Sequence, residues 1–293
     1  MKVAFIFDKH REGTTGTYLE RACGALGVAA DHWWLREAKQ IPAGYDLYLR
    51  IDHGDDYLVR LPARLRPAVF YAIDTHLAHS WKKVKRTAGW YDMVFCCHRD
   101  GAARLRGAVW LPVACDPQVH ASRREERPAW DVAFVGTDGG VPRKFYLQAL
   151  RERYAHSAIG PADYTQMREI YGRTRIGFNY AIAQDVNMRV FETLAAGACL
   201  VTNALAGDDL ERLGLRDREH LVLYRRPAEL FPAIDHYLAH DEERQRIGRA
   251  GQALVLARHT YVHRMRQLLT DAVARLSLPP PLDLKESAAC ASW

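Results

Sequence analysis

The segment Asn187-Met188-Arg189-Val190-Phe191-Glu192 carries the residue types and spacing that point most clearly to chemistry. Asn187 is a favourable N-cap, so a helix is expected to begin at Met188. Arg189 then falls in the first turn, where a cation opposes the helix dipole unless an anion occupies the helix N-terminus. Glu192 follows on the same face, and its carboxylate can accept hydrogen bonds from a ribose diol. The segment predicts a nucleotide diphosphate site; the competing interpretation is a surface Arg189–Glu192 ion pair, worth about 0.2–0.5 kcal/mol.

Alternating apolar runs and helical patterns predict the elements that position this segment. Residues 2–8 form an apolar run that ends in an acid, which is typical of a strand buried on both faces of a parallel sheet. A polar, glycine-bearing loop at 9–17 and a helical pattern follow it. In this half further strands are expected at 46–51, 69–73, 93–97 and 109–113, and helices at 18–26, 77–87 and 101–106. The alternation predicts an open α/β sheet.

A second domain is expected behind a polar stretch bounded by prolines, between Asp116 and Pro128. Residues 130–135 again resemble a buried strand and close on a glycine turn at Gly136, which by itself is a signal of low specificity. Further strands are expected at 176–180, 199–202 and 221–224, and helices at 163–171, 188–196, 228–240, 242–257 and 262–276. We therefore predict an α/β fold of two doubly wound, Rossmann-like domains at 1–116 and 130–276, a linker at 117–129, a tail at 277–293 and a reaction site in the cleft between the domains.

Composition and charge narrow the class of partner. The chain has 293 residues and a net charge of +6, which favours anionic partners. Its basic residues are scattered and are not interleaved with a nucleic-acid motif, so no nucleic-acid partner is expected. No long apolar stretch and no signal-peptide pattern stand out, and a cytoplasmic protein is expected. The cysteines show neither CxxC spacing nor a metal-site pattern, so neither a disulfide nor a zinc site is expected at Cys23, Cys96, Cys97, Cys115, Cys199 or Cys290.

The C-terminal half resembles a known family. The stretch NMRVFETLAAGACLVTN, followed by DDLERLGL, HLVLYR and AELFPAIDHYLAHDEERQRIGRAGQALVLARHTYVHRM, is similar to the CgeB-like glycosyltransferases of the GT-B superfamily, which is related to glycosyltransferase family 4. The resemblance covers roughly residues 130–276 and is strongest in the R-x-x-E-x-x-A-x-G helix and the H-T-Y-x-x-R segment. The N-terminal half resembles the same group more weakly, through residues 71–76 and 110–117. The resemblance implies a GT-B fold and glycosyl transfer.

The resemblance also implies roles for individual residues. Glu192 matches the second acid of the E-x7-E pattern of family 4 and is expected to bind the nucleotide ribose. The first acid is replaced by Gln184, which can bond a sugar hydroxyl but carries no charge. By similar reasoning Arg189 and Arg143 are expected to neutralise the diphosphate, with Lys144 as a weaker candidate. The predicted nucleotide-binding set is Gly136, Arg143, Lys144, Gln184, Asn187, Arg189 and Glu192.

The acceptor side is expected in the N-terminal domain, where Asp8, His10, Asp74, His76 and His79 fall at or after predicted strand ends. A transfer that inverts the anomeric centre needs a base near the acceptor hydroxyl, whereas a retaining transfer does not. Asp74 and His76 are the preferred catalytic pair, and the alternative is that Asp74 only caps the helix after its strand. His10 and the loop at 13–17 are expected to shape the cleft and to contact phosphate through backbone amides.

Taken together, these residues predict a hexosyltransferase or related enzyme that moves a sugar from a nucleoside diphosphate sugar, of UDP type, to an acceptor hydroxyl. The acceptor would be a glycan, a protein or a lipid-linked group, and the basic charge allows peripheral contact with an anionic membrane. No obligatory cofactor or metal is expected, because arginines and a helix N-terminus stabilise the leaving nucleotide. Two alternatives stay open: a sugar-nucleotide epimerase of the same fold, and a nucleotide-binding protein without catalysis. The second alternative follows from Gln184, which replaces an expected acid.

Overall fold

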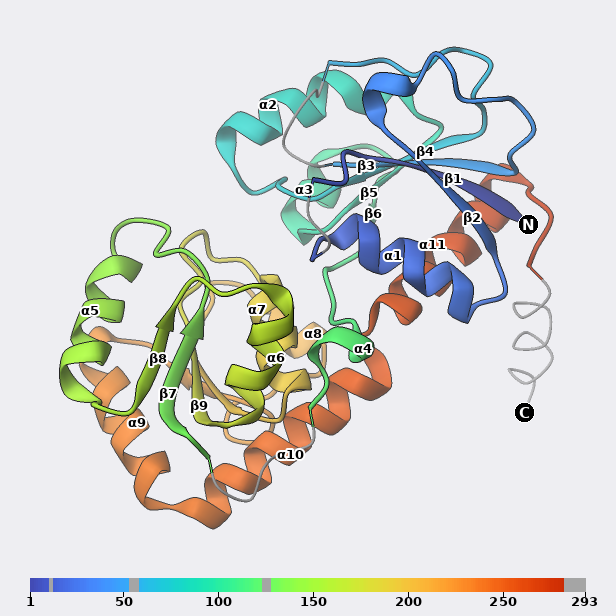
Figure 1. Cartoon of the computed structure of the whole chain (residues 1–293). Helices are drawn as coiled ribbons and strands as arrows, with labels where there is room; N and C mark the ends of the chain where they lie inside the picture. The colour runs from blue at the N-terminus through green and yellow to red at the C-terminus, as the bar shows by residue number, and fades with distance from the viewer. Residues whose placement is uncertain (11–12, 53–57, 123–127, 282–293) are drawn as a thin grey trace. The chain divides into compact units, whose positions relative to one another are not determined.

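The computed structural model describes residues 1–10, 13–52, 58–122 and 128–281, and its contacts divide the chain into two compact units. Unit 1 comprises Met1–Val113 together with the C-terminal helix that begins at Tyr261, and unit 2 comprises Ala114–Thr260. Each unit is built on one parallel sheet with helices packed on it (Figure 1). The predicted α/β class with two parallel sheets is confirmed.

The sheet of unit 1 has six parallel strands in the order β2-β1-β3-β4-β5-β6. Every residue of β3 and β4 is buried; β4 is an uninterrupted apolar run, whereas β3 also contains the buried Arg50. The strand order reverses direction between β1 and β3. The strands are β1 (Lys2–Ile6), β2 (Ala29–Trp33), β3 (Leu47–Ile51), β4 (Ala68–Ala72), β5 (Met93–Cys96) and β6 (Val109–Trp110).

The C-terminal helix α11 (Tyr261–Leu276) packs on unit 1, not on the unit that precedes it in the chain. The Tyr261 hydroxyl lies 3.3 Å from Oγ1 of Thr15, and Arg264 donates from Nε to the carbonyl of Pro112 at 2.7 Å. The predicted domain ending at 276 is therefore wrong. The apolar stripe of a helix shows that one face is buried but not which core it covers. The other helices of this unit are α1 (Thr15–Ala25), α2 (Ala78–Thr87) and α3 (Arg99–Arg104), with 3₁₀ turns η1 (Leu35–Glu37) and η2 (Ala88–Trp90).

The sheet of unit 2 has five parallel strands in the order β11-β10-β9-β7-β8, and this order reverses direction between β7 and β9. Such a reversal leaves a crevice at the carboxyl ends of the two strands, where open α/β sheets bind their ligands. The strands are β7 (Trp130–Val135), β8 (Ser157–Gly160), β9 (Thr174–Asn179), β10 (Cys199–Asn203) and β11 (Val222–Tyr224).

Strand β7 shows how the helices cover both faces of this sheet. Val132 and Phe134 pack into a core with residues of α5 and α9, whereas Ala133 and Val135 pack with residues of α6 and with Ala196 at the end of α7. The unit is thus doubly wound, as predicted. Its helices are α4 (Pro117–His120), α5 (Arg143–Arg153), α6 (Tyr164–Gly172), α7 (Met188–Ala195), α8 (Asp209–Arg212), α9 (Leu230–Ala239) and α10 (Asp241–Arg258), with the 3₁₀ turn η3 (Pro227–Glu229).

Two strands and two short helices, α4 and α8, were not expected from the sequence. β2 and β8 lie at sheet edges and are only partly buried, so neither forms a continuous apolar run. Helix α4 falls within the predicted linker, and the predicted boundary near residue 116 moves to Val113, where unit 1 ends. Residues 123–127 of that linker lie outside the described residues, as does most of the predicted tail.

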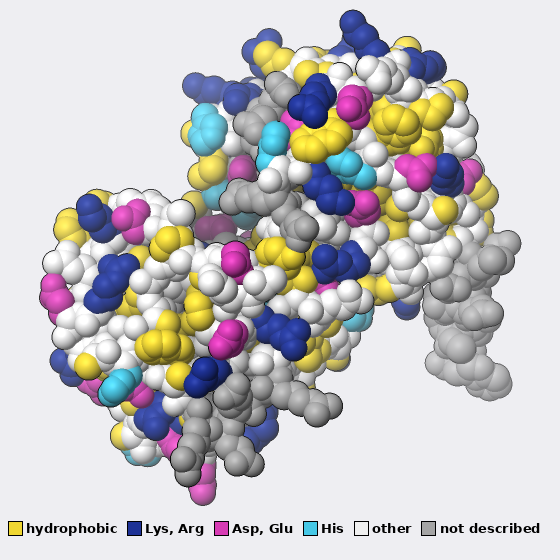
Figure 2. All heavy atoms as spheres, viewed as in Figure 1, with side chains coloured by type: hydrophobic (Ala, Val, Ile, Leu, Met, Phe, Trp, Pro, Cys, Tyr) yellow, Lys and Arg dark blue, Asp and Glu magenta, His cyan; other side chains and the backbone are white. Residues whose placement is uncertain are grey.

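The surface and the cysteines bear on the predicted partners. On the face drawn in Figure 2, Lys and Arg side chains are dispersed among acidic and apolar ones. No helix in the described ranges combines the length and apolar character needed to cross a bilayer. The five cysteines that the structure describes are buried, and Cys290 lies outside those residues.

Candidate functional site

Arg189 occupies the crevice at the switch point of unit 2. Its Nε donates to the carbonyl oxygen of Val135, the last residue of β7, at 2.9 Å. Its Nη1 donates to Oδ1 of Asn179, the last residue of β9, at 3.2 Å. The guanidinium also stacks 4.2 Å from the ring centre of Phe134. A cation is therefore held at the carboxyl ends of the two strands between which the sheet reverses.

Gly136 makes this position of Arg189 attainable. Its φ of +139° is a conformation that L side chains rarely adopt, and a Cβ at this residue would collide with Nη2 of Arg189. Its backbone N–H donates to the carbonyl of Gly160 at 2.9 Å. Glycine is therefore required at position 136 for two reasons: the conformation of the turn and the close approach of the Arg189 side chain.

Arg143, the first residue of α5, brings a second guanidinium to the same crevice. Its Nε donates to the carbonyl of Asp138 at 2.8 Å, and its Nη2 donates to that of Thr137 at 3.1 Å. Burial, and then the positive charge of Arg189, lower the pKa of Arg143, while Asp138 and Asp185 oppose the shift. Within the described ranges neither arginine forms a salt bridge, and both donate to neutral oxygens. Two neighbouring cations held in this way suit an anion with several oxygens.

Lys144 differs from Arg143. It is exposed on the first turn of α5, and its ammonium makes no hydrogen bond or ion pair with the residues that the structure describes. The structure therefore does not join Lys144 to the two arginines.

Helix α7 begins where the sequence predicts, with Asn187 as N-cap. The Asn187 side chain makes no capping hydrogen bond, and its Oδ1 is buried without a hydrogen-bond partner among the described residues. The side chain of Asn187 thus does not cover the N-terminus of α7, although the Val190 amide donates to the Asn187 carbonyl at 3.2 Å.

Gln184 lies in the loop between β9 and α7, with a φ of +57°. Its side-chain Oε1 accepts a hydrogen bond from the backbone N–H of Ala206 at 3.0 Å, which ties this loop to the segment after β10. The amide oxygen is therefore engaged in holding the loop. The amide nitrogen remains as a donor that could reach a ligand.

Glu192 is buried, with 8% of its surface exposed. Burial raises its pKa to about 7, and the positive charge of Arg189 only partly opposes this shift. No salt bridge joins Arg189 to Glu192 within the described chain, so the alternative of a surface ion pair is wrong. A buried carboxyl with a strongly raised pKa beside a sheet crevice has the character of a functional group.

His120 is the neighbour of Glu192 that the sequence analysis missed. It ends α4 with 1% of its surface exposed, and its Nε2 lies 3.7 Å from Oε1 of Glu192. The sequence does contain a signal for helix α4, because Asp116 is a favourable N-cap and Pro117 occupies the first helical position. The polar composition of the surrounding residues favoured a linker instead.

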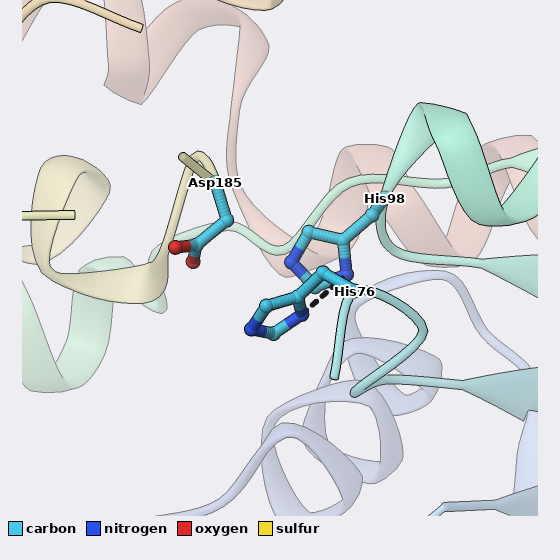
Figure 3. Close-up of side chains that lie close together, drawn as sticks. All are labelled: His76, His98 and Asp185. Atoms are coloured by element: carbon cyan, nitrogen blue, oxygen red, sulfur yellow. Dashed lines mark hydrogen bonds between the residues drawn. The ribbon is translucent and has the colours of Figure 1, made fainter. Parts of the chain in front are cut away.

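In unit 1 the predicted catalytic residues follow β4. Asp74 does not cap α2, because the N-cap is Leu77 and no side chain caps this helix, so that alternative is wrong. His76 Nδ1 lies 3.2 Å from Nδ1 of His98, and a dashed line marks this contact in Figure 3. His98 follows β5, the strand next to β4, and also lies 3.2 Å from Oγ1 of Thr75. The strand-end rule that selected His76 applies equally to His98, which the sequence analysis did not name.

The remaining predicted acceptor-side residues are dispersed along the edge of the unit 1 sheet. The Asp8 carboxylate accepts a hydrogen bond from the N–H of Leu35 at 3.2 Å. The His10 ring makes an edge contact with Trp34, with ring centres 5.3 Å apart. His79 is exposed on α2. Among the described residues, no hydrogen bond, ion pair or ring contact joins these three residues to the His76–His98 pair, and part of the loop after His10 lies outside the described residues.

Comparisons with solved structures give the fold a known counterpart. An alpha-glucosyltransferase in complex with UDP and a 13-mer DNA containing a central A:G mismatch is 11% identical, with a TM-score of 0.68 over 94% of this chain and 100% of that one. HepE from Anabaena, in complex with UDP-glucose, is 11% identical with a TM-score of 0.65 over 94% and 100%. Sucrose-phosphate synthase from Thermosynechococcus elongatus is 12% identical with a TM-score of 0.64 over 94% and 99%. At these identities the likeness shows the fold, which is GT-B.

Sequence comparison adds the family. Curated protein sequences give no match to this chain. The model of the glycosyl transferase-like family matches residues 119–270. This range spans more than half of the 293 residues and includes both arginines of the crevice, Glu192 and His120. The chain therefore belongs to the glycosyl transferase-like family.

Proposed function

We propose that this protein transfers a sugar from a nucleoside diphosphate sugar, of UDP type, to an acceptor hydroxyl, and that unit 2 holds the nucleotide. The observation that carries the proposal is the placement of Arg189 at the switch point of the sheet, beside the N-terminus of α7 and with buried Glu192 on the same helix. Two cations lie close to each other there, and the helix N-terminus and the buried carboxyl both belong to α7. That combination matches a diphosphate joined to a ribose.

The diphosphate would be bound by Arg189, Arg143 and the amides at the start of α7. Neither guanidinium is paired with a carboxylate among the described residues, so an incoming diphosphate would supply the negative charge that the crevice lacks. The Gly136 turn lets the backbone and Arg189 come close, and Lys144 would add a more distant charge. Glycosyl transfer leaves additional charge on the departing diphosphate, and fixed cations stabilise it as it develops. These groups do the work that a divalent ion does in other transferases, so we propose transfer without an obligatory metal.

The ribose would be bound by Glu192. An ionised carboxylate accepts charge-assisted hydrogen bonds from both hydroxyls of a diol, and burial strengthens them. The buried Oδ1 of Asn187 accepts no hydrogen bond within the described chain, and a ligand hydroxyl would satisfy it. Gln184 would contact the donor sugar through its amide nitrogen, without the charge of the acid that family 4 enzymes carry there.

The acceptor would be activated in unit 1 by His76, with Asp74 nearby and His98 paired to His76 through their Nδ1 atoms. Only one of the two facing nitrogens can carry the hydrogen-bonding proton, so two neutral rings take opposite tautomers. We propose a glycan, a protein or a lipid-linked group as acceptor, within the CgeB-like branch related to family 4. DNA accompanies one of the structural neighbours, but the dispersed charge in Figure 2 does not favour a nucleic-acid acceptor here.

Calorimetric titration of the whole chain with UDP, GDP and dTDP tests the nucleotide site. We expect UDP to bind, and Arg189→Ala and Glu192→Ala to weaken it at least about tenfold, because each removes a charged contact of about 1.5–3 kcal/mol. The proposal fails if none of the three nucleotides binds, or if both variants bind like the wild type. Incubation with UDP-glucose then separates the activities: glycosylated acceptor indicates transfer, a changed sugar without acceptor indicates epimerisation, and neither indicates a binding protein.

A further inference from the structure

Helix α4 is built around its last residue, His120. Asp116 is the N-cap, its carboxylate accepts from the N–H of Gln118 at 2.9 Å, and Pro117 starts the helix. The backbone N–H of Asp116 donates to Nδ1 of His120 at 2.9 Å, while the N–H of His120 donates back to the Asp116 carbonyl at 2.8 Å. One residue therefore holds both the backbone and the ring of His120. Its side chain is buried at a fixed place in unit 2.

This arrangement determines which ring nitrogen carries the proton. Because Nδ1 accepts the Asp116 N–H, a neutral His120 ring carries its proton on Nε2. Nε2 is also the atom that lies 3.7 Å from Oε1 of Glu192. The separation is longer than a direct hydrogen bond, so at this distance the contact is an electrostatic one between a polar N–H and a carboxyl group. The ring presents a donor, not an acceptor, to Glu192.

The other charged and titratable neighbours of Glu192, Arg189 and Tyr171, make hydrogen bonds with other residues. Arg189, on the same helix, donates to Val135 and Asn179. The Tyr171 hydroxyl, from α6, accepts the backbone N–H of Val135 at 3.0 Å. His120 is the neighbour whose donor faces a Glu192 oxygen, and it reaches that oxygen from a different element of the fold.

We propose that His120 is a positioning residue for Glu192, and that this contact makes the site select ribonucleotides over 2′-deoxyribonucleotides. The inference rests on the proposed nucleotide site and deepens it. A carboxylate with one oxygen facing the His120 N–H can direct its remaining lone pairs at both ribose hydroxyls. When the 2′-hydroxyl is absent, a buried carboxylate oxygen is left without its donor, which is costly. Without His120 the carboxylate reorients or takes up a proton, and the missing hydroxyl matters less.

The experiment compares the affinities of UDP and 2′-deoxy-UDP by calorimetry on the whole chain. Two substitutions separate the two ends of the ring. His120→Asn keeps a short side chain that can accept the Asp116 N–H but has no donor that reaches Glu192. His120→Gln extends an amide N–H toward the place of Nε2. His259→Asn is the matched control, because His259 is also buried in unit 2 but places its Nε2 2.7 Å from the backbone carbonyl of Leu213.

We expect the wild type to prefer UDP by a factor on the order of 30, the effect of one buried hydroxyl contact. His120→Asn should reduce that preference to less than about threefold, mainly by losing affinity for UDP, while His120→Gln and His259→Asn keep most of it. If His120→Asn binds UDP and keeps the full preference, the role of His120 is overturned while the nucleotide site stands. If the wild type binds neither nucleotide, the proposed function itself fails.

A measurement on the wild type covers the case in which His120→Asn does not fold. The ¹⁵N spectrum of histidine-labelled protein should contain a neutral ring with an unprotonated Nδ1 and a protonated Nε2, whose Nε2 signal moves on adding UDP and moves much less on adding 2′-deoxy-UDP. The absence of such a ring, or equal shifts with both nucleotides, would overturn the proposal.

Discussion

Arg189 donates from Nε to the carbonyl oxygen of Val135 at 2.9 Å, so a side chain from the first turn of α7 is joined to the last residue of β7. This bond crosses the place where the order of the sheet reverses, and it orients the guanidinium. A flexible cation at a helix N-terminus would have to be ordered when an anion binds. Here the ordering is already present in the fold, which favours tight binding of a diphosphate.

Replacement of Arg189 by lysine should fail to restore nucleotide binding. Lysine has all its donors on one nitrogen, whereas Arg189 contacts Val135 and Asn179 from two different nitrogens and keeps a further N–H group for a phosphate. We expect Arg189→Lys to weaken UDP binding about 10- to 100-fold, nearly as much as Arg189→Ala. Isothermal titration measures this. Arg249→Ala, which removes a positive charge from the exposed side of α10, should bind UDP like the wild type; equal losses in the two variants would mean that only net charge matters.

Gly136→Ala should destabilise the fold and reduce UDP binding together. The new methyl group would meet the Arg189 guanidinium, and the backbone at φ +139° disfavours any side chain. We expect a loss of about 2–4 kcal/mol in the free energy of unfolding, measured with urea, from strain and the displaced side chain.

A double-mutant cycle isolates the contact itself. In an Arg189→Ala background, Gly136→Ala should cost at least about 1 kcal/mol less than in the wild type, because the colliding group is gone. Gly44→Ala is the matched control: φ is +103° there, and nothing lies within 4 Å of an added Cβ. Additive losses at Gly136 and Arg189 would contradict the packing argument.

Glu192→Gln should raise the stability of the protein at alkaline pH. Burial raises the pKa of Glu192 from 4.5 to about 7, so between these values the folded protein binds more protons than the unfolded chain, and stability falls as the pH rises. The shift corresponds to a loss of about 3 kcal/mol above pH 7. Thermal melts should show Glu192→Gln close to the wild type at pH 4 and clearly more stable at pH 8. Glu242→Gln, on the exposed side of α10, should show no such divergence.

Binding of UDP-glucose should strengthen as the pH rises through about 7. The ionised carboxylate accepts both ribose hydroxyls, and the diphosphate of UDP-glucose is a diester with no proton of its own to lose in this range. With the pKa of Glu192 at about 7, the affinity should rise about tenfold from pH 6 to pH 8. The Glu192→Gln variant should bind weakly and with a flat profile. An affinity that falls over this range, or an equally steep rise in the variant, would exclude ionised Glu192 as the ribose ligand.

His76→Ala should slow sugar transfer without weakening UDP binding. A general base contributes about 10²- to 10⁴-fold to a rate, so its removal should lower kcat by that order. His98→Ala should cause a smaller loss, because His98 orients the His76 ring at 3.2 Å and does not replace it. Product formation and UDP titration measure the two effects. His79→Ala, which replaces an exposed histidine on α2, should leave both sugar transfer and UDP binding unchanged. Unchanged transfer in His76→Ala would exclude His76 as the general base.

The sequence by itself determined the parallel strands that are buried on both faces. β7 (Trp130–Val135) begins and ends where its apolar run predicts, because such strands need unbroken hydrophobic character. The start of α7 and the place of Arg189 in its first turn also follow from local signals, since N-capping depends on neighbouring residues. These predictions concern interactions between residues close in sequence, or the bare fact of burial.

Tertiary structure decided which residues meet. The sequence placed Glu192 on the same helix face as Arg189 but did not show that Glu192 is buried beside His120, which comes from a segment whose composition indicated a linker. His76 meets His98 because their strands pair, and α11 packs on unit 1 although it follows unit 2 in the chain. Hydrophobic periodicity indicates that one face of an element is buried, but it does not indicate which other element packs against that face. The pairing of polar side chains across elements depends on strand order and helix placement, which emerge only when the whole chain packs.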